Sequence, residues 1–423
     1  MQTSIDHSPA QHAELAGNGV EVGHSVPTHR DKEEEEEVVL WMRGDGELRS
    51  TTRPRCAYPS KIDRVRCLLH IAEELSHHRN RDDGYFPISS REVAKAIGQD
   101  HTGWAFEEVL VTGILETDGR SVPDKKCRWY RYSQRALGLP LERVVISGQV
   151  ASRLKAHRVD RIRATISCDP VHEFLWNSLG KLTLNAPGHL DRENGLANTP
   201  AGIAYANMTI DRLTRRDFFF SHDRRTGRVF NTFTNMPKTL RKHALLDGRP
   251  LVEIDVKNSQ PVLLKTFSPD AGSERESFIA TVRGGAFYEV VNAASDKPLP
   301  EADRELIKER IFSQVLFGPI NPHFPMWKAF SRLFPALANE VIRQKAKSWN
   351  AFPLELQRRE AAIMIGQVTP SLIKELEGVP FLTIHDSIAV PAEFADIVAA
   401  TIKREFLRVV GFEPSLRISG VGA

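Results

Sequence analysis

The sequence predicts an α+β protein built from several folded parts. Three observations indicate this class: a length of 423 residues with 41% hydrophobic residues, a series of short amphipathic helices in the first half, and apolar strands carrying carboxylates in the second half. The length is near three times that of a typical domain, and the apolar fraction is ample for buried cores. A mainly disordered chain and a disulfide-stapled chain are therefore excluded.

The composition narrows the cellular setting. The four cysteines, Cys56, Cys67, Cys127 and Cys168, are far apart and form no C-x-x-C pair, so they indicate reduced thiols and no zinc ribbon. No apolar run approaches the roughly 18 residues that span a bilayer, and the N-terminus has no signal-peptide pattern. These features predict a cytoplasmic protein without a membrane partner.

An acidic arm is expected over residues 1–50, because five consecutive glutamates repel one another and bury nothing. This segment holds four Lys and Arg residues against eleven Asp and Glu residues, a balance of −7. The net charge of the whole chain is +3, so the remainder carries +10. The small global charge therefore hides a basic body, to which a polyanion would be attracted.

Residues 58–138 are predicted to form a small helical domain. The segment 61–78 has a broad apolar face, as a core-facing helix requires. Ser89 and Glu92 form a capping-box pattern that begins a helix over 91–97.

Gly98 ends that helix, and a further helix is expected over about 101–112. Two extended pieces follow, 114–117 and 127–132, joined by a polar loop. Three helices and a two-stranded ribbon in this order are typical of a winged helix-turn-helix.

Cations alternate with aromatic residues in the second strand of the ribbon, where Arg128 and Arg131 flank Trp129 and Tyr130. This pattern suits phosphate and base contact, so both arginines are candidate DNA-binding residues. Helix-turn-helix folds also serve as protein-binding modules, and that alternative stays open.

A helical segment is predicted over 145–200, and a basic segment follows it. Residues 213–243 carry eight Lys and Arg residues against two Asp residues, with five phenylalanines among them. A phosphate backbone would be attracted to such a segment. Its candidate DNA-binding residues are Arg228, Lys238 and Arg241.

Two strands of the second half carry the acidic chemistry. Residues 251–256 form an apolar strand with carboxylates at alternate positions, the second being Asp255. Residues 379–390 read as a tight hairpin with His385 and Asp386 at its turn. A carboxylate on an apolar strand is costly unless a cation meets it.

A third motif lies between these strands, in a predicted helix where Arg304, Lys308 and Phe312 share one face and Phe317-Gly318 follows. With Asp255 ahead of them and His385-Asp386 behind, these motifs resemble the palm of family A DNA polymerases and of the related single-subunit phage-type RNA polymerases.

The resemblance covers about residues 200 to 423, and the pattern looks most like the compact family-A-like polymerases of mobile elements and viruses. It implies a polymerase palm over 201–423, an antiparallel sheet with helices, with a reduced fingers insertion at about 265–345. Residues 145–200 would then be a small thumb, preceded by the winged-helix-like domain and the disordered arm.

Nucleotidyl transfer in this superfamily uses two divalent ions about 4 Å apart. The resemblance implies that Asp255 and Asp386 hold two Mg²⁺ ions, or Mn²⁺, as catalytic and metal-binding residues. Cations opposite the metals bind the incoming triphosphate, a role that falls to Arg304 and Lys308. The remaining nucleotide-binding candidates are Phe312, Phe317 and Gln260.

Contacts to a template-primer are implied for further positions. Arg228 stands about two dozen residues before the first motif, where these families place an arginine-bearing segment. Gln357 lies on an amphipathic helix over 350–365 that resembles the helix lining the primer-template minor groove. His385 belongs to the last motif.

Several departures leave the substrate open. Val-Lys-Asn separates Asp255 from Ser259-Gln260, no Glu follows Gln260, Ser387 follows Asp386, and Phe317 replaces a tyrosine. The expected function is a template-directed nucleotidyltransferase, a DNA-directed DNA polymerase without proofreading, with DNA template-primer and nucleoside triphosphates as partners. The alternatives are a non-catalytic DNA-binding replication initiator, and a primase or RNA polymerase with the same site.

Overall fold

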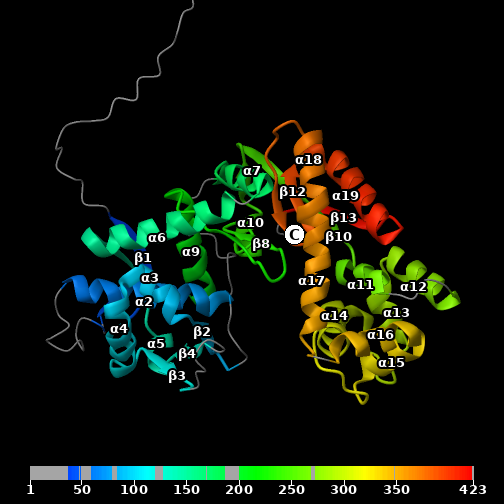
Figure 1. Cartoon of the computed structure of the whole chain (residues 1–423), viewed down its shortest axis with the longest axis horizontal. Coiled ribbons are helices and arrows are strands. Elements are labelled where there is room, and N and C mark those ends of the chain that lie inside the picture. The colour runs from blue at the N-terminus through cyan, green and yellow to red at the C-terminus, as the bar shows by residue number, and fades with distance from the viewer. Residues whose placement is uncertain are drawn as a thin grey trace, which may run out of the picture.

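The computed structural model describes residues 37–46, 48, 59–78, 83–119, 127–167, 169–185, 200–267, 272–346 and 348–421. Residues 1–36, Cys56, Cys168 and most of the loop between the predicted ribbon strands lie outside these ranges. Figure 1 shows an N-terminal part, blue to cyan, beside a C-terminal part, green to red. No described helix has both the length and the apolar character to span a membrane.

The N-terminal part packs three helices against a three-stranded antiparallel sheet in the order β2-β4-β3. Ser89 Oγ accepts a hydrogen bond from the Glu92 backbone N–H at 3.3 Å, which confirms the N-cap of the second helix. Gly98 has a φ of +99°, so the tight turn between the second and third helices favours a residue without Cβ. The elements are α2 (Pro59–His78), β2 (Phe86–Ile88), α3 (Ser90–Ile97), α4 (Gln99–Val111), β3 (Leu115–Thr117), β4 (Arg128–Tyr132) and α5 (Gln134–Leu137).

Two predictions for this part are corrected. The ribbon has a third strand, β2, which pairs with β4. The disordered arm was expected to reach residue 50, but β1 (Val38–Arg43) pairs antiparallel with β5 (Leu141–Ile146). Leu40 and Met42 are fully buried in the same core as α2, because the apolar run after the glutamates satisfies its backbone on β5.

The C-terminal part is built on an antiparallel sheet in the order β11-β12-β10-β9-β6, with β13 also paired to β10. Its strands are β6 (Leu182–Leu184), β9 (Ala244–Leu246), β10 (Arg249–Val256), β11 (Leu382–Ile384), β12 (Ser387–Pro391) and β13 (Leu416–Gly420). Since β6 belongs to this sheet, the body predicted to begin at residue 201 begins earlier. The expected thumb segment 145–200 is correspondingly divided between α6 (Gly148–Ile166), α7 (Pro170–Leu179) and β6.

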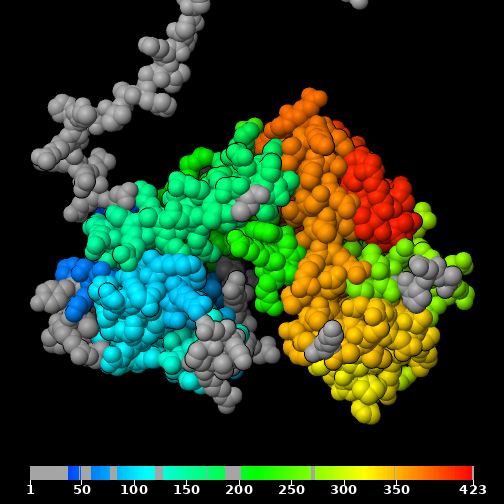
Figure 2. Space-filling view, in the orientation of Figure 1, coloured from blue at the N-terminus to red at the C-terminus, as the bar shows by residue number. Residues whose placement is uncertain are grey.

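Between the sheet and the first helices of this part lie α9 (Pro200–Thr214), the hairpin β7 (Phe220–His222) and β8 (Val229–Asn231), and α10 (Lys238–Arg241). Figure 2 shows this green segment between the cyan N-terminal part and the orange α17. One apolar core joins α7, the sheet and the helices that follow.

The expected insertion at 265–345 is helical and packs into that same core. Two π-helical segments, Phe312–Leu316 and Met364–Val368, interrupt the helices near the carboxylate strands. The helices are α11 (Ser259–Leu264), α12 (Ser273–Arg283), α13 (Phe287–Ala293), α14 (Arg304–Ile311), α15 (Pro325–Leu333), α16 (Pro335–Lys345), α17 (Ala351–Ile363), α18 (Thr369–Glu375) and α19 (Ala395–Val410).

Candidate functional site

The pairing of β10 with β12 brings Asp255 and Asp386 together. Asp255 lies opposite Ser387 in the antiparallel register, and Asp386 directly precedes Ser387. The Val256 N–H donates to the Asp386 carbonyl at 3.3 Å. His385 and Asp386 form a two-residue turn, with His385 in the left-handed region at a φ of +52°. The predicted hairpin is therefore present, and 131 residues of intervening chain separate two neighbouring acids.

The environment of Asp386 disfavours its charged form. Burial raises the pKa of Asp386 well above its ordinary value, and the negative charges of Glu360 and Asp255 raise it further, against the opposing charge of Arg228. Repulsion between nearby carboxylates of this kind is relieved when a cation binds between them.

Asp255 lies between acidic and basic neighbours. Burial raises its pKa, as does Glu253, while Arg417, Lys308 and Lys238 lower it. The Arg417 guanidinium is 3.6 Å from the Asp255 carboxylate, and its side chain is more than half exposed. Lys308 comes from α14, so the motif helix presents its cation to the carboxylate strand.

A third carboxylate, Glu360 on α17, connects three elements beneath this site. Its side chain is 2% exposed. It accepts hydrogen bonds from Arg228 Nη2 at 2.5 Å, from Gln260 Nε2, and from Ser259 Oγ at 3.4 Å. Burial raises the pKa of Glu360, and Arg228 opposes that shift. Glu360 thus fixes Arg228 and Gln260, two sequence candidates, relative to one another.

Glu360 is not among the residues that the sequence motifs single out. Its position carried a signal, however, because it falls on the same helical face as the buried Phe352, Leu356 and Ile363. An acid on an apolar helix face requires a cationic or hydrogen-bonding partner.

Several buried polar atoms around these residues have no hydrogen-bond partner among the described residues. They are both side-chain polar atoms of Asn258, Gln260 Oε1, Arg228 Nε and His385 Nδ1. Asn258 stands at the turn between β10 and α11 with a φ of +55°. Buried groups without partners are rare and costly, which indicates that this region is arranged for a polar ligand.

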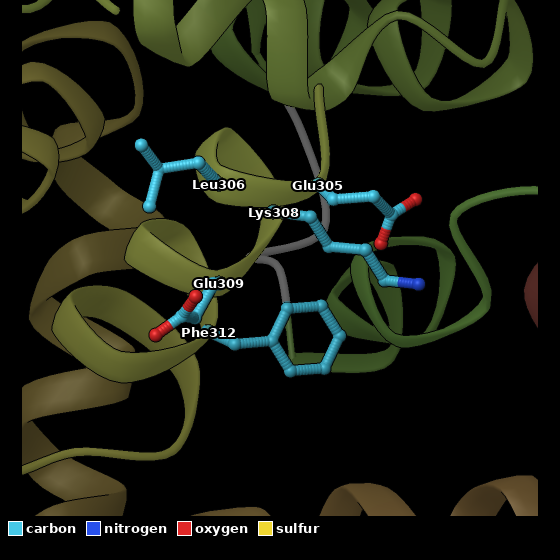
Figure 3. Close-up of a pocket in the computed structure, with 5 residues that line it drawn as sticks. All are labelled: Glu305, Leu306, Lys308, Glu309 and Phe312. Atoms are coloured by element: carbon cyan, nitrogen blue, oxygen red, sulfur yellow. The ribbon is translucent and has the colours of Figure 1, made fainter. Parts of the chain in front are cut away.

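The α14 face carries the predicted triphosphate cations. Lys308 Nζ lies 5.9 Å from the centre of the Phe312 ring. Figure 3 shows both side chains pointing to the same side, in an open depression whose other lining residues are Glu305, Leu306 and Glu309.

Arg304 is engaged at the surface. It forms a 2.9 Å ion pair with Glu289, and its guanidinium lies 5.8 Å from the ring centre of Tyr288. Tyr288, on α13, was not predicted to take part. Burial and the charges of Asp386 and Asp255 raise the pKa of Tyr288, so this aromatic side chain lies between α14 and the two acids.

Phe312 and Phe317 flank a π-helical turn, with their ring centres 4.8 Å apart in an edge-to-face arrangement. The turn brings the backbone so close that a Cβ on Gly318 would lie 1.9 Å from the Ser313 carbonyl oxygen. Lys345 Nζ donates to the carbonyls of Val315 and Gly318, both at 2.7 Å. π-Helical turns often occur at functional sites.

The predicted template-primer residues of the C-terminal part lie around the two acids. Lys238 is exposed, and Gln357 is half-exposed on α17. Arg241 is half-buried, with its Nε donating to the Met236 carbonyl at 3.0 Å.

His385 packs edge-to-face on Phe230, with ring centres 5.2 Å apart. Burial, with the charges of Arg228 and Arg241, lowers the pKa of His385 to about 4. The imidazole is therefore neutral at neutral pH.

Arg128 and Arg131 are not brought to this site, because β4 lies in the N-terminal part (Figure 1). Arg128 is exposed. Arg131 forms a 2.8 Å ion pair with Glu116 and stacks over Tyr85 at 4.8 Å.

Comparisons with known proteins give little further information. No family model matches the chain, and no curated protein matches it. One similar solved structure is the POL domain of Pol1 from M. smegmatis in complex with DNA primer-template and dNTP, at 13% identity and a TM-score of 0.38. The match covers 63% of this chain and 65% of that one.

Proposed function

We propose that this protein is a template-directed nucleotidyltransferase, a DNA-directed DNA polymerase without proofreading. The observation that carries the proposal is the register of β10 and β12, which sets Asp255 beside Asp386. Lys308, from a helix more than fifty residues further along the chain than Asp255, lowers the pKa of that acid. Two converging acids with a cation across from them suit a triphosphate substrate bound through divalent ions.

Asp255 and Asp386 would hold the metal ions. Both pKa values are raised, and Asp386 is repelled by two other carboxylates. The donors are carboxylate oxygens, which hard cations such as Mg²⁺ or Mn²⁺ prefer. Within the described ranges no cluster of three His, Cys, Asp or Glu side chains occurs, so a substrate phosphate would complete the coordination. Bound metal would activate the attacking hydroxyl and neutralise the leaving pyrophosphate.

The remaining nucleotide-binding roles follow from the α14 face. Lys308 would pair with the triphosphate, while Phe312 and Phe317 would offer an apolar surface to a base or sugar. Arg304 would exchange its exposed pair with Glu289 for phosphate oxygens. Gln260 would orient the nucleotide from its fixed position beside Glu360.

The template-primer would bind across α17 and the basic segment. Arg228 is held in place by Glu360, and Lys238 and Gln357 would reach the strand from exposed positions. Arg241 and the neutral imidazole of His385 would support the strand next to Asp386.

The N-terminal part would be a winged-helix-like domain, with Arg128 on an exposed edge of its sheet. The alternative of a sequence-reading replication initiator needs a helix suited to the major groove. The third helix of the domain, α4, carries Asp100, Glu107 and Glu108 and no Lys or Arg. That charge disfavours insertion between phosphates.

A primase or RNA polymerase would use the same acids, so the substrate decides. The test is incubation of the protein with dNTPs or rNTPs, on primed and unprimed templates, with Mg²⁺ or Mn²⁺. The proposal expects dNTP extension of primed DNA. Transfer with rNTPs on unprimed DNA would indicate the alternative, and no product under any combination would refute nucleotidyl transfer.

A further inference from the structure

A second basic surface lies on the N-terminal part, away from the two acids. α3 and α6 together carry seven Lys and Arg residues against two acids, Glu92 and Asp160, a balance of +5 over 27 residues. This exceeds the net charge of the whole chain, +3. The α3–α6 surface is defined by the exposed cations Arg91, Lys95, Arg153, Lys155, Arg161 and Arg163.

Two of these cations align along one side of α6. Arg153, His157 and Arg161 follow at four-residue spacing, so they lie on the same side of the helix. Arg153 and Arg161 are about 12 Å apart along the axis. Arg153 reaches over the turn between α3 and α4, since its Nη1 would lie 2.9 Å from a Cβ on Gly98.

The acids on this surface are already engaged. Glu92 forms a 2.8 Å ion pair with Lys95 and lies 3.6 Å from His157. Lys95 and then Arg161 and His157 lower the pKa of Glu92 against the effect of burial. One carboxylate therefore serves several cations, which leaves an excess of positive charge.

The neighbouring helix has the opposite character. α4 carries three acids and no Lys or Arg, and Val111 at its end is 58% exposed. In the known helix-turn-helix arrangement the helix at this position enters the major groove. Here the positive charge lies on the preceding helix and on α6 instead.

We propose that the α3–α6 surface binds the phosphate backbone of duplex nucleic acid, and that α4 reads no base sequence. This binding does not require catalysis, so it stands apart from the proposed nucleotidyl transfer. It would hold the duplex outside the catalytic half of the protein, independently of sequence, by charge attraction to phosphates.

The test uses the full chain with Arg153→Ala and Arg161→Ala together. Affinity for a blunt duplex is measured by fluorescence anisotropy between 50 and 200 mM salt. Each lost phosphate contact lowers the slope of log affinity against log salt by about 0.9. Over this fourfold salt range, two contacts make wild-type binding roughly 12-fold more salt-sensitive than that of the variant.

The matched control is Arg343→Ala with Arg408→Ala, which removes the same charge from exposed positions on α16 and α19. A second variant, Arg153→Lys with Arg161→Lys, keeps the charges and should keep the slope. A slope equal to wild type in the double alanine variant, or equal losses in both alanine pairs, would overturn the proposal.

Two duplexes of unrelated sequence should bind with the same affinity, and a preference of tenfold or more would contradict the absence of base reading. Asp386→Asn separates this inference from the proposed function. It should abolish primer extension and leave the salt slope of duplex binding unchanged. If the wild-type protein extends no primer, the slope comparison still decides the inference.

Discussion

Replacing Glu360 with glutamine should destabilise the C-terminal part, because it leaves a guanidinium without its counter-charge. The Arg228 side chain is only 16% exposed and Glu360 is 2% exposed. Removing one partner of a buried ion pair costs about 3–5 kcal/mol, and the residual exposure of Arg228 places the expected loss at about 3 kcal/mol. In a part of this size each kcal/mol lowers Tm by about 2–4 °C, so Tm should fall by about 6–12 °C.

Differential scanning calorimetry measures this change. The control is Glu355→Gln on the same helix, whose carboxylate pairs with Arg358 and Arg359 while remaining 32% exposed. Partly exposed pairs contribute up to about 1 kcal/mol each, so this control should shift Tm much less.

A double variant makes the reasoning sharper. Arg228→Met with Glu360→Gln removes both charges, so it should be more stable than Glu360→Gln alone. Equal melting of Glu360→Gln and Glu355→Gln, or a double variant less stable than the single one, would refute the role of Glu360 as the counter-ion.

Two further predictions concern the π-helical turn. Gly318→Ala should raise the KM for nucleotide and lower Tm, because its Cβ would lie 1.9 Å from the Ser313 carbonyl oxygen; Gly103→Ala, in open space on α4, should not change the KM. Burial lowers the pKa of Lys345 to about 8 from its model value of 10.5, so between these values the unfolded chain binds more protons and wild-type stability should rise with pH. Lys345→Met, followed by urea denaturation from pH 8 to 10, should lack that rise, and parallel profiles would contradict the shift.

The strands that carry the site could be predicted from the sequence. Apolar runs containing Asp255 and Asp386 have the period of half-buried strands, and the turn at His385 is short enough to force a hairpin. The approach of the two acids did not follow from either strand alone, because their pairing depends on closure of a long intervening chain.

Other features depend on tertiary contacts that a local pattern does not report. The strand β1 was hidden because the glutamates before it dominate the composition, while its partner β5 lies a hundred residues away. Glu360 looked like one polar residue of an amphipathic helix, and its role emerges only where Arg228 and Gln260 converge on it.

Single-turnover primer extension by Asp386→Asn tests the central claim most directly. Since metal ligation supplies several kcal/mol and each 1.36 kcal/mol is a factor of ten, the rate should fall by at least about 10³-fold. The variant should melt no lower than wild type at neutral pH, because burial already raises the pKa of Asp386 and disfavours its charge. Glu393→Gln, an exposed carboxylate just after β12, is the control and should extend normally. A folded Asp386→Asn protein that extends primers within tenfold of the wild-type rate would contradict the account.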